Sequence, residues 1–363
     1  MALSIGIVGL PNVGKSTLFN AITQAGIPAQ NFPFCTIEPN TGIVTIPDER
    51  LNQLAKISES EKTLPATITF TDIAGLVAGA SKGEGLGNKF LSHIRETSAI
   101  AHVVRCFDDD NVTHVDGRVD PIKDVEIINI ELMMADLELC EKLIQGQSKR
   151  AKADKAETQK LTLLERIRDQ LAQEKPIRQM DLDKDDAAML KGFQFISTKK
   201  IIYVANVEEN AIESGNAHSN TLSEFAKAQG DECILVSAQI EEELSSLDET
   251  EKQEFLESLG LDCSGLERLS KACFTLLDLQ TYLTTGPKET RAWTIPVGAL
   301  APQAAGVIHT DFEHGFIRAN VVSFDDFIAA SGWKGAKEKG ILRQEGKDYI
   351  MQDGDVVEFL FNV

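Results

Sequence analysis

The sequence predicts an α/β protein with a parallel sheet, and three observations support this fold class. Apolar, strand-like runs alternate with polar, helix-like segments over residues 1–125, which is typical of a parallel α/β sheet. The same alternation returns at residue 200, so one discontinuous domain is expected over 1–125 and 200–277. Residues 126–199 are expected to form an inserted helical domain, and residues 278–363 a separate α+β module.

The strands expected in the discontinuous domain are short and apolar. They are Leu3 to Val8, Ile43 to Ile46, Thr67 to Asp72, Ala99 to Phe107, Ile201 to Ala205 and Cys233 to Val236. The segment from Ser16 to Thr23 suits the helix that should follow the first strand.

The inserted domain is expected to be an antiparallel coiled-coil hairpin. Apolar residues recur at three- and four-residue steps from Ile128 to Leu143 and again from Leu161 to Leu171, as on one face of a helix. Pro176 closes the second helix. Lys149 to Lys160 carries five basic and two acidic residues, or +3, which predicts a basic tip. Two ordinary core helices are the alternative.

The C-terminal module is expected to contain short strands around one short helix. The strand candidates are Arg291 to Ile295, Phe316 to Val322 and Val356 to Phe361, and the helix candidate is Ala301 to Val307. Ser331 to Lys347 is a second basic window, with five basic and two acidic residues, or +3.

Composition narrows the function classes. The net charge of −20 over 363 residues repels nucleic acid, so any RNA contact must use the local basic windows. The six cysteines lack C-x-x-C spacing, which argues against a zinc site or a disulfide framework, and most should be buried. No apolar run approaches the ~18 residues of a membrane span, so we expect a cytoplasmic protein without a membrane partner. We also expect no sequence-specific readout of DNA. The acidic stretch Glu241 to Glu257 is interpreted as a solvated helix face.

The segment from Gly9 to Thr17 carries the clearest chemistry. It fits G-x-x-x-x-G-K-[ST] between a strand and a helix, the context of a phosphate-binding loop. Backbone N–H groups can close around phosphate oxygens, and the helix start adds its positive dipole end. Lys15 can reach the β- and γ-phosphates, and the Ser16 hydroxyl can ligate Mg²⁺. A chance glycine-rich turn is the alternative.

Two further segments suit a metal and the γ-phosphate. Asp72, at a strand end, can hold Mg²⁺ through water, and the Gly75 N–H can approach the γ-phosphate. Thr36, in the loop from Asn31 to Asn40, can carry a hydroxyl to the metal when γ-phosphate is present. An incidental turn and a structural threonine are the alternatives.

The base-reading segment favours ATP over GTP. Asn206 to Glu209 follows a strand where N-K-x-D would read guanine, but valine and glutamate replace the lysine and aspartate. That aspartate accepts hydrogen bonds from guanine N1–H and the 2-amino group, and adenine has neither donor. Asn206 can still bond adenine N7 and its 6-amino group, Val207 can pack on the base, and Ser237 occupies the last base-loop position.

Intrinsic hydrolysis is expected to be slow. Leu76 stands where many GTPases place the glutamine that orients the attacking water. Asn12 could ligate K⁺ beside the developing charge, and His114 could approach the γ-phosphate. A partner could supply the missing group, and His114 could be an ordinary surface residue.

These motifs together resemble the Obg-related branch of translation-factor GTPases. The segments Asn206 to Glu209 and Tyr282 to Gly286 are similar to those of its YchF/Obg-like ATPase subfamily. The resemblance implies a G domain, the helical hairpin, and a C-terminal TGS module with a β-grasp-like fold. It implies ATP preference with residual GTP use, Mg²⁺ dependence, K⁺ sensitivity and ribosome association.

The resemblance also implies roles for individual residues. It assigns phosphate binding to Asn12, Val13, Gly14, Lys15, Ser16 and Thr17. It assigns Mg²⁺ to Ser16 and Thr36, and base contacts to Asn206 and Val207.

The main hypothesis is a cytoplasmic ATPase that switches conformation on the ribosome. The basic hairpin tip and the TGS module would contact ribosomal RNA or protein. One alternative is a metabolic kinase with a small phosphate acceptor. Another is a nucleotide-gated, protein-binding stress or redox regulator without a ribosomal role.

Overall fold

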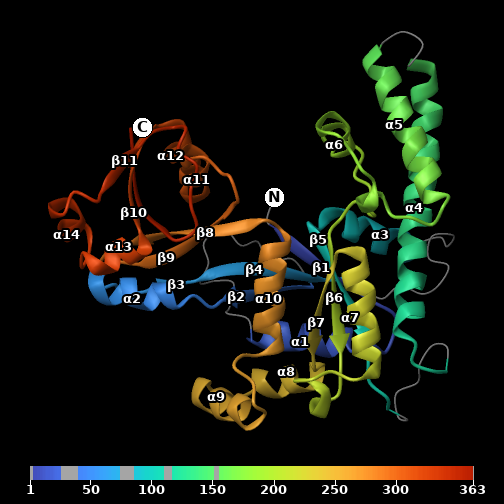
Figure 1. Cartoon of the computed structure of the whole chain (residues 1–363), viewed down its shortest axis with the longest axis horizontal. Coiled ribbons are helices and arrows are strands. Elements are labelled where there is room, and N and C mark those ends of the chain that lie inside the picture. The colour runs from blue at the N-terminus through green and yellow to red at the C-terminus, as the bar shows by residue number, and fades with distance from the viewer. Residues whose placement is uncertain (1–2, 26–39, 74–85, 110–116, 151–154, 363) are drawn as a thin grey trace. The chain divides into compact units, whose positions relative to one another are not determined.

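A computed structural model describes residues 3–25, 40–73, 86–109, 117–150 and 155–362. The chain forms two compact units (Figure 1). The first unit comprises residues 1–43 and 69–269, and the second comprises residues 44–68 and 270–363. The division into domains at residues 125, 199 and 277 stays a prediction.

A six-stranded sheet in the order β2-β4-β1-β5-β6-β7 carries the first unit. Its strands are β1 (Ser4–Val8), β2 (Thr41–Ile46), β4 (Ala66–Asp72), β5 (Ala99–Arg105), β6 (Ile201–Asn206) and β7 (Glu232–Val236). Every residue of β5 and β6 is buried, as expected for central strands covered on both faces. The strands predicted from the sequence are present, with ends that differ by at most two residues.

The parallel pairing brings the carboxyl ends of the strands to one edge of the sheet. β1 pairs in parallel with β4 and β5, and β6 pairs in parallel with β5 and β7. Ile7 is in register with Asp72, and Arg105 with Asn206. Parallel sheets bind ligands outside these carboxyl ends, so the two motif residues Asp72 and Asn206 lie at the edge where a site belongs.

Helices connect the strands of the first unit. They are α1 (Lys15–Ala25), α3 (Leu86–Glu96), α4 (Pro121–Arg150), α5 (Lys155–Leu171), α6 (Lys184–Leu190), α7 (Ala217–Gln229), α8 (Ala238–Ser245), α9 (Glu249–Ser258) and α10 (Gly265–Leu276), with the short 3₁₀ helices η3 (Ile177–Gln179) and η4 (Glu209–Ala211). α1 packs against α8, and α4 packs against α7. Within the described ranges, no helix is both long and apolar enough to cross a membrane.

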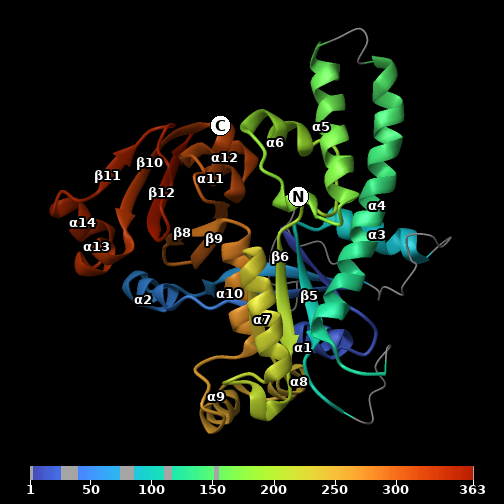
Figure 2. The same cartoon turned by 45° about the vertical axis from the view of Figure 1, so that its right-hand side comes forward.

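The two helices predicted from the apolar periodicity are present as α4 and α5. They run side by side in opposite directions (Figures 1 and 2). Their shared core includes Met133, Cys140, Leu164 and Ile167. The N-terminal part of α4 is also buried, at Val125 among others, so this helix begins in the core of the first unit.

A buried carboxylate fastens the returning chain to α4. Asp136, which is fully buried, accepts hydrogen bonds from the backbone N–H groups of Ile196 and Ser197 at 2.9 and 2.7 Å. The Ser197 hydroxyl donates a third bond at 2.7 Å. Burial raises the pKa of Asp136, and these bonds act in the opposite direction. Three donors on one carboxylate fix the base of the hairpin.

Glu241 contradicts the interpretation of the acidic stretch as a wholly solvated face. α9 has no buried residue, but Glu241 of α8 is 3% exposed and accepts a 2.7 Å hydrogen bond from the Gly265 N–H. Its carboxylate therefore caps the positive N-terminal end of α10. In the sequence, a glutamate that is buried as a helix cap cannot be distinguished from the solvated glutamates beside it. The acidic pattern therefore did not identify Glu241 as buried.

We expect Glu241 to make stability depend on pH. Burial raises its pKa from 4.5 to about 7, so the folded protein retains a proton that the unfolded chain loses. Stability should therefore fall as the pH rises from about 5 to 8, by roughly 2–3 kcal/mol from this group. In urea unfolding at both pH values, Glu241→Gln should flatten this fall, because an amide oxygen still accepts the bond.

The exposed neighbour Glu242 provides a matched control. Glu242→Gln should leave the pH dependence unchanged. An equal effect of both substitutions would show that Glu241 is not the titrating group.

A second six-stranded sheet, in the order β11-β10-β12-β8-β9-β3, carries the second unit. Its strands are β3 (Thr63–Leu64), β8 (Leu279–Thr285), β9 (Thr290–Pro296), β10 (Phe316–Ser323), β11 (Arg343–Glu345) and β12 (Asp355–Phe361). β12 pairs antiparallel with β10 and parallel with β8, which yields a mixed sheet.

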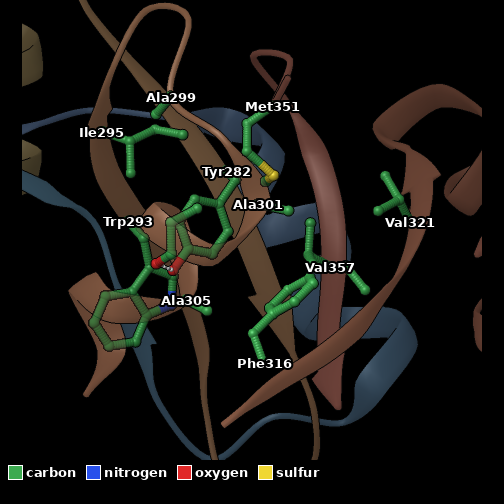
Figure 3. Packing of buried hydrophobic residues seen from close by; sticks show 12 residues of the cluster. Tyr282, Trp293, Ile295, Ala299, Ala301, Ala305, Phe316, Val321, Met351 and Val357 are labelled. Carbon is green, nitrogen blue, oxygen red and sulfur yellow. Dashed lines mark hydrogen bonds between the residues drawn. The ribbon is translucent and has the colours of Figure 1, made fainter. Parts of the chain in front are cut away.

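An aromatic cluster forms one core of this unit. Tyr282 and Trp293, on neighbouring strands, stack with ring centroids 6.4 Å apart, and Met351 and Val357 belong to the same cluster (Figure 3). The Tyr282 hydroxyl donates a 3.0 Å hydrogen bond to the Ala304 carbonyl. That bond satisfies the polar end of a fully buried side chain and fixes a helix on the sheet.

The expectation of one short helix in residues 278–363 was wrong. The described residues there form α11 (Ala301–Ile308), α12 (Thr310–His314), α13 (Phe324–Ala329) and α14 (Trp333–Glu338). The last three helices have only five or six residues. Such lengths are too short for apolar periodicity to be recognised.

Residues 44–68 were expected in the nucleotide-binding domain, yet they group with the C-terminal part of the chain. α2 (Glu49–Ser58) inserts Leu51 and Leu54 into a core that includes Leu283 and Val356. β3 extends the second sheet by pairing with β9. The chain between Asn40 and Asp72 therefore passes through the second unit.

Arg50 fastens α2 within the second unit. Its guanidinium donates to both carboxylate oxygens of Asp48 at 2.8 Å and to Asp353 at 2.8 Å. It also donates to the Thr281 hydroxyl at 3.0 Å. Asp353 and Thr281 lie more than 200 positions from Arg50 along the chain, which no local pattern reveals.

Candidate nucleotide-binding site

The phosphate-loop motif adopts a loop between β1 and α1, as predicted. Asn12 and Gly14 have left-handed backbone conformations, with φ of 61° and 93°. A Cβ on Gly14 would lie 2.2 Å from the Asn206 Nδ2 atom. Glycine is therefore required at Gly14 both for its conformation and for the close approach of Asn206.

Lys15 is the first residue of α1, and its side chain extends back into the phosphate loop. Its side chain is 8% exposed, and its Nζ donates a 2.6 Å hydrogen bond to the Leu10 carbonyl. Burial lowers the pKa of Lys15 from 10.5 to about 8, and the nearby Asp72 carboxylate partly opposes that shift. The ammonium group is thus concentrated positive charge in a poorly hydrated position, which suits an incoming polyanion.

Asp72 and Ser16 are the two predicted metal ligands that lie within the described residues. Asp72 ends β4 and is half-buried, and burial raises its pKa while Lys15 lowers it. Ser16 is exposed in the first turn of α1. A partly desolvated carboxylate and an exposed hydroxyl are oxygen donors that Mg²⁺ accepts, so these residues fit the ion.

The side chain of Asn206 is already hydrogen-bonded to other parts of the protein. It is 4% exposed at the end of β6. Its Nδ2 donates to the Val13 carbonyl at 2.9 Å, and its Oδ1 accepts from the Ala238 N–H at 2.9 Å. The side chain therefore ties the phosphate loop to the start of α8, a role that the sequence analysis did not foresee.

The neighbouring base-loop residues are buried. Val207 and Ser237 are each 2% exposed, and the Val207 N–H donates to the Val236 carbonyl at 2.9 Å. By contrast, Glu209, which replaces the guanine-reading aspartate, is exposed at the start of η4. The expected base contacts of Asn206, Val207 and Ser237 stay predictions.

The remaining site residues divide into two groups. Val13 is 1% exposed within the loop, and Thr17 is half-buried in α1. Thr36, Gly75 and His114 lie outside the described residues.

Behind the loop, β5 contributes an uncharged histidine. His102 is in register with Val8 and is 1% exposed. Burial lowers its pKa to about 3, with smaller contributions from Lys15 and Arg178. His102 therefore does not compete with Lys15 as a cation at neutral pH. The burial that keeps it neutral is not evident from a single histidine in an apolar strand.

Nucleotide binding should take up a proton at alkaline pH. Since the pKa of Lys15 is about 8 in the free protein, a bound triphosphate should restore the ammonium form. We expect uptake of nearly one proton at pH 9 and about a tenth of one at pH 7. Calorimetric titration with nucleotide in buffers of different ionisation enthalpy measures this number.

Lys15→Arg serves as the control, because a guanidinium stays protonated throughout this range. Its binding enthalpy should not depend on the buffer. Buffer-independent binding by the parent protein at pH 9 would contradict the lowered pKa.

Comparisons with known proteins point to one group. A family model described as a 50S ribosome-binding GTPase matches residues 4–135, and a YchF C-terminal model described as a protein of unknown function matches residues 279–362. Proteins named ribosome-binding ATPase YchF from Pasteurella multocida and Bacillus subtilis are 56% and 53% identical, over the whole of both chains. The structure of the Schizosaccharomyces pombe YchF GTPase is similar with a TM-score of 0.89 and 36% identity, covering 99% of this chain and 97% of that one.

Proposed function

The chain belongs to the YchF family, and we propose that it hydrolyses ATP, in preference to GTP, on the ribosome in the cytoplasm. One observation carries the nucleotide part of this proposal. Lys15 is buried within the phosphate loop, at the start of α1, in the electrostatic field of Asp72. The ribosomal part rests on the names of the relatives.

The loop would stabilise charge on the transferred phosphoryl group. Backbone N–H groups at the start of α1 and the Lys15 ammonium would bind phosphate oxygens, including those that gain charge during hydrolysis. Ser16, Thr36 and Asp72 would hold magnesium, which supplies charge neutralisation at the β- and γ-phosphates when bound. The Gly75 N–H would contribute at the γ-phosphate.

The changed base-reading segment, Asn206 to Glu209, supports ATP preference. Guanine needs an acceptor for its N1–H and 2-amino groups, and Glu209 is exposed in η4. Val207 provides no charge in place of the usual lysine. Guanine therefore gains little over adenine in this site, and weak use of GTP is expected.

Hydrolysis would need help beyond the phosphate loop. Leu76 cannot orient water through a side-chain amide. Asn12, in its left-handed conformation, would ligate K⁺ near the leaving group, and His114 would act from its own loop. Phosphate release from ATP by the purified protein, with and without ribosomes, tests the proposed function. An inactive protein under both conditions would refute it.

The ribosome contacts would use the two basic windows. Lys149 and Arg150 are the last two residues of α4, and Lys152 lies outside the described residues. In the second unit, Lys334, Lys337 and Lys339 are exposed. Arg343 contributes less free charge, because it lies 3.4 Å from both Glu345 and Asp355.

Charge reversal at the hairpin tip should weaken ribosome binding. In co-sedimentation at about 100 mM salt, Lys149→Glu, Arg150→Glu and Lys152→Glu together should reduce bound protein at least ~10-fold, because phosphate contacts dominate such binding. The same number of reversals at the exposed residues Lys175, Lys227 and Lys271 should have little effect. Equal losses in both variants would remove the tip from the proposal.

Two of the described cysteines do not support the redox form of the alternative hypothesis. Cys106 and Cys140 are buried, and burial raises the pKa of Cys140 to about 11. Burial also raises the pKa of Cys106. Reactive cysteines need thiolate character and access, so neither suits redox sensing.

A further inference from the structure

The second unit contains an apolar groove that the nucleotide chemistry does not use. Its cavity volume is about 580 Å³. It forms where β8 and β12 separate, because these two strands are in register only at Leu283 and Val356. Beyond this pair, residues 284–289 line one wall and residues 357–359 the other.

The groove is lined with partly exposed aromatic rings. Phe312, Trp333 and Phe359 each retain some exposed surface, and Trp293 adds a buried ring. The Arg291 guanidinium already lies 3.8 Å from the centre of the Trp293 ring. Aromatic faces attract cations in this way, so the lining suits a cationic group with an apolar stem.

The charges at the groove favour a cation over an anion. Glu289 and Glu358 line it together with Lys288, so the lining carries a net charge of −1 (one basic, two acidic). Glu289 has no ion pair among the residues that the structure describes. Glu358 accepts a 2.9 Å hydrogen bond from the side chain of Asn320, which is a neutral partner.

The diverging strands also suit an extended backbone. β8 is fully paired with β9, and β12 is fully paired with β10, but their facing edges separate after Leu283 and Val356. Such edges can accept a further strand, with backbone bonds supplying affinity and pockets selecting side chains.

We propose that this groove binds an extended, arginine- or lysine-containing segment of a protein partner. The inference rests on the proposed function, which makes a basic tail of a ribosomal protein the occupant. The aromatic rings hold the apolar stem of the basic side chain, and Glu289 and Glu358 pair with its charge. The groove shares Trp333 with the second basic window, but the charged residues of its lining are Lys288, Glu289 and Glu358.

Fluorescence anisotropy with the full-length protein and a labelled heptapeptide of alternating valine and arginine tests the proposal. The parent should bind this peptide and should not bind its citrulline counterpart, which lacks the charge. Glu289→Gln with Glu358→Gln should weaken peptide binding about fivefold, the scale of two exposed ion pairs. The control Asp325→Asn with Glu338→Gln removes the same charge from exposed positions outside the groove and should change affinity less than twofold.

Besides a failure of the parent protein to bind the peptide, three outcomes would overturn the inference. The first is binding of the citrulline peptide with the same affinity as the arginine peptide. The second is an equal loss of peptide affinity in the two double variants. The third is displacement of the peptide by a uridine decamer that binds more tightly once the glutamates are neutralised. ATP hydrolysis and ribosome co-sedimentation are measured on the same preparations. If both persist without peptide binding, the groove proposal alone fails; if the peptide binds but both are absent, the proposed function alone fails.

Discussion

Replacing Lys15 with alanine should reduce ATP hydrolysis at least ~100-fold, the scale of losing one group that stabilises transition-state charge. The nucleotide-free protein should remain as stable as the parent or become more stable. Burial lowers the pKa of Lys15, so its ammonium group is less favourable in the folded protein than in water. Steady-state phosphate release and thermal unfolding measure the two effects.

The separation of activity from stability makes this prediction specific. Lys227→Ala removes an exposed lysine from α7 and should change neither quantity. Undiminished hydrolysis by the Lys15→Ala variant would remove the phosphate loop from the mechanism. Unfolding of that variant would show that Lys15 has mainly a structural role.

Replacing Asn206 with alanine should lower the affinities for ATP and GTP by similar factors. Its amide joins the Val13 carbonyl to the Ala238 N–H, so its loss leaves two buried backbone groups unsatisfied. We expect about 2–4 kcal/mol of destabilisation from these groups, together with a loosened phosphate loop. Calorimetry with both nucleotides, alongside urea unfolding, measures the result.

Asn206→Asp provides a graded comparison. Aspartate keeps the acceptor for the Ala238 N–H but places a carboxylate oxygen against the Val13 carbonyl. It should therefore also weaken both nucleotides. A loss confined to ATP in the alanine variant would instead identify Asn206 as a reader of adenine, as the sequence suggested.

The elements that the sequence predicted well are those with a local physical cause. β5 and β6 are buried along their whole length, and they appear in the sequence as continuous apolar runs. The phosphate loop was predictable because its geometry requires glycine at a fixed position. Gly14 has a left-handed backbone and lies against Asn206, so no other residue fits there. α4 and α5 were predictable because an extended apolar stripe has a clear helical period.

What the sequence did not reveal depends on partners distant along the chain. α2 packs in the second unit because Leu54 meets Leu283, and Arg50 reaches Asp353. Glu241 became a buried cap only when Gly265 was brought beside it. The sequence assigned the Asn206 amide to the base. Only the fold shows that two backbone groups, the Val13 carbonyl and the Ala238 N–H, already hydrogen-bond to it.

The route of the chain between Asn40 and Asp72 is the other feature that only the fold reveals. The two segments expected to sense the γ-phosphate lie on either side of residues 44–68, which belong to the second unit. Thr285, at the rim of the groove, shares a 2.8 Å hydrogen bond with Ser58 of α2. The connection between the expected nucleotide loops is thus part of the structure that forms the groove.

The central claim is most directly tested by measuring hydrolysis of ATP and GTP side by side with one preparation of the parent protein. The replacement of the guanine-reading lysine and aspartate by Val207 and Glu209 predicts a higher kcat/KM for ATP, with slower but measurable use of GTP. A higher kcat/KM for GTP would contradict the account.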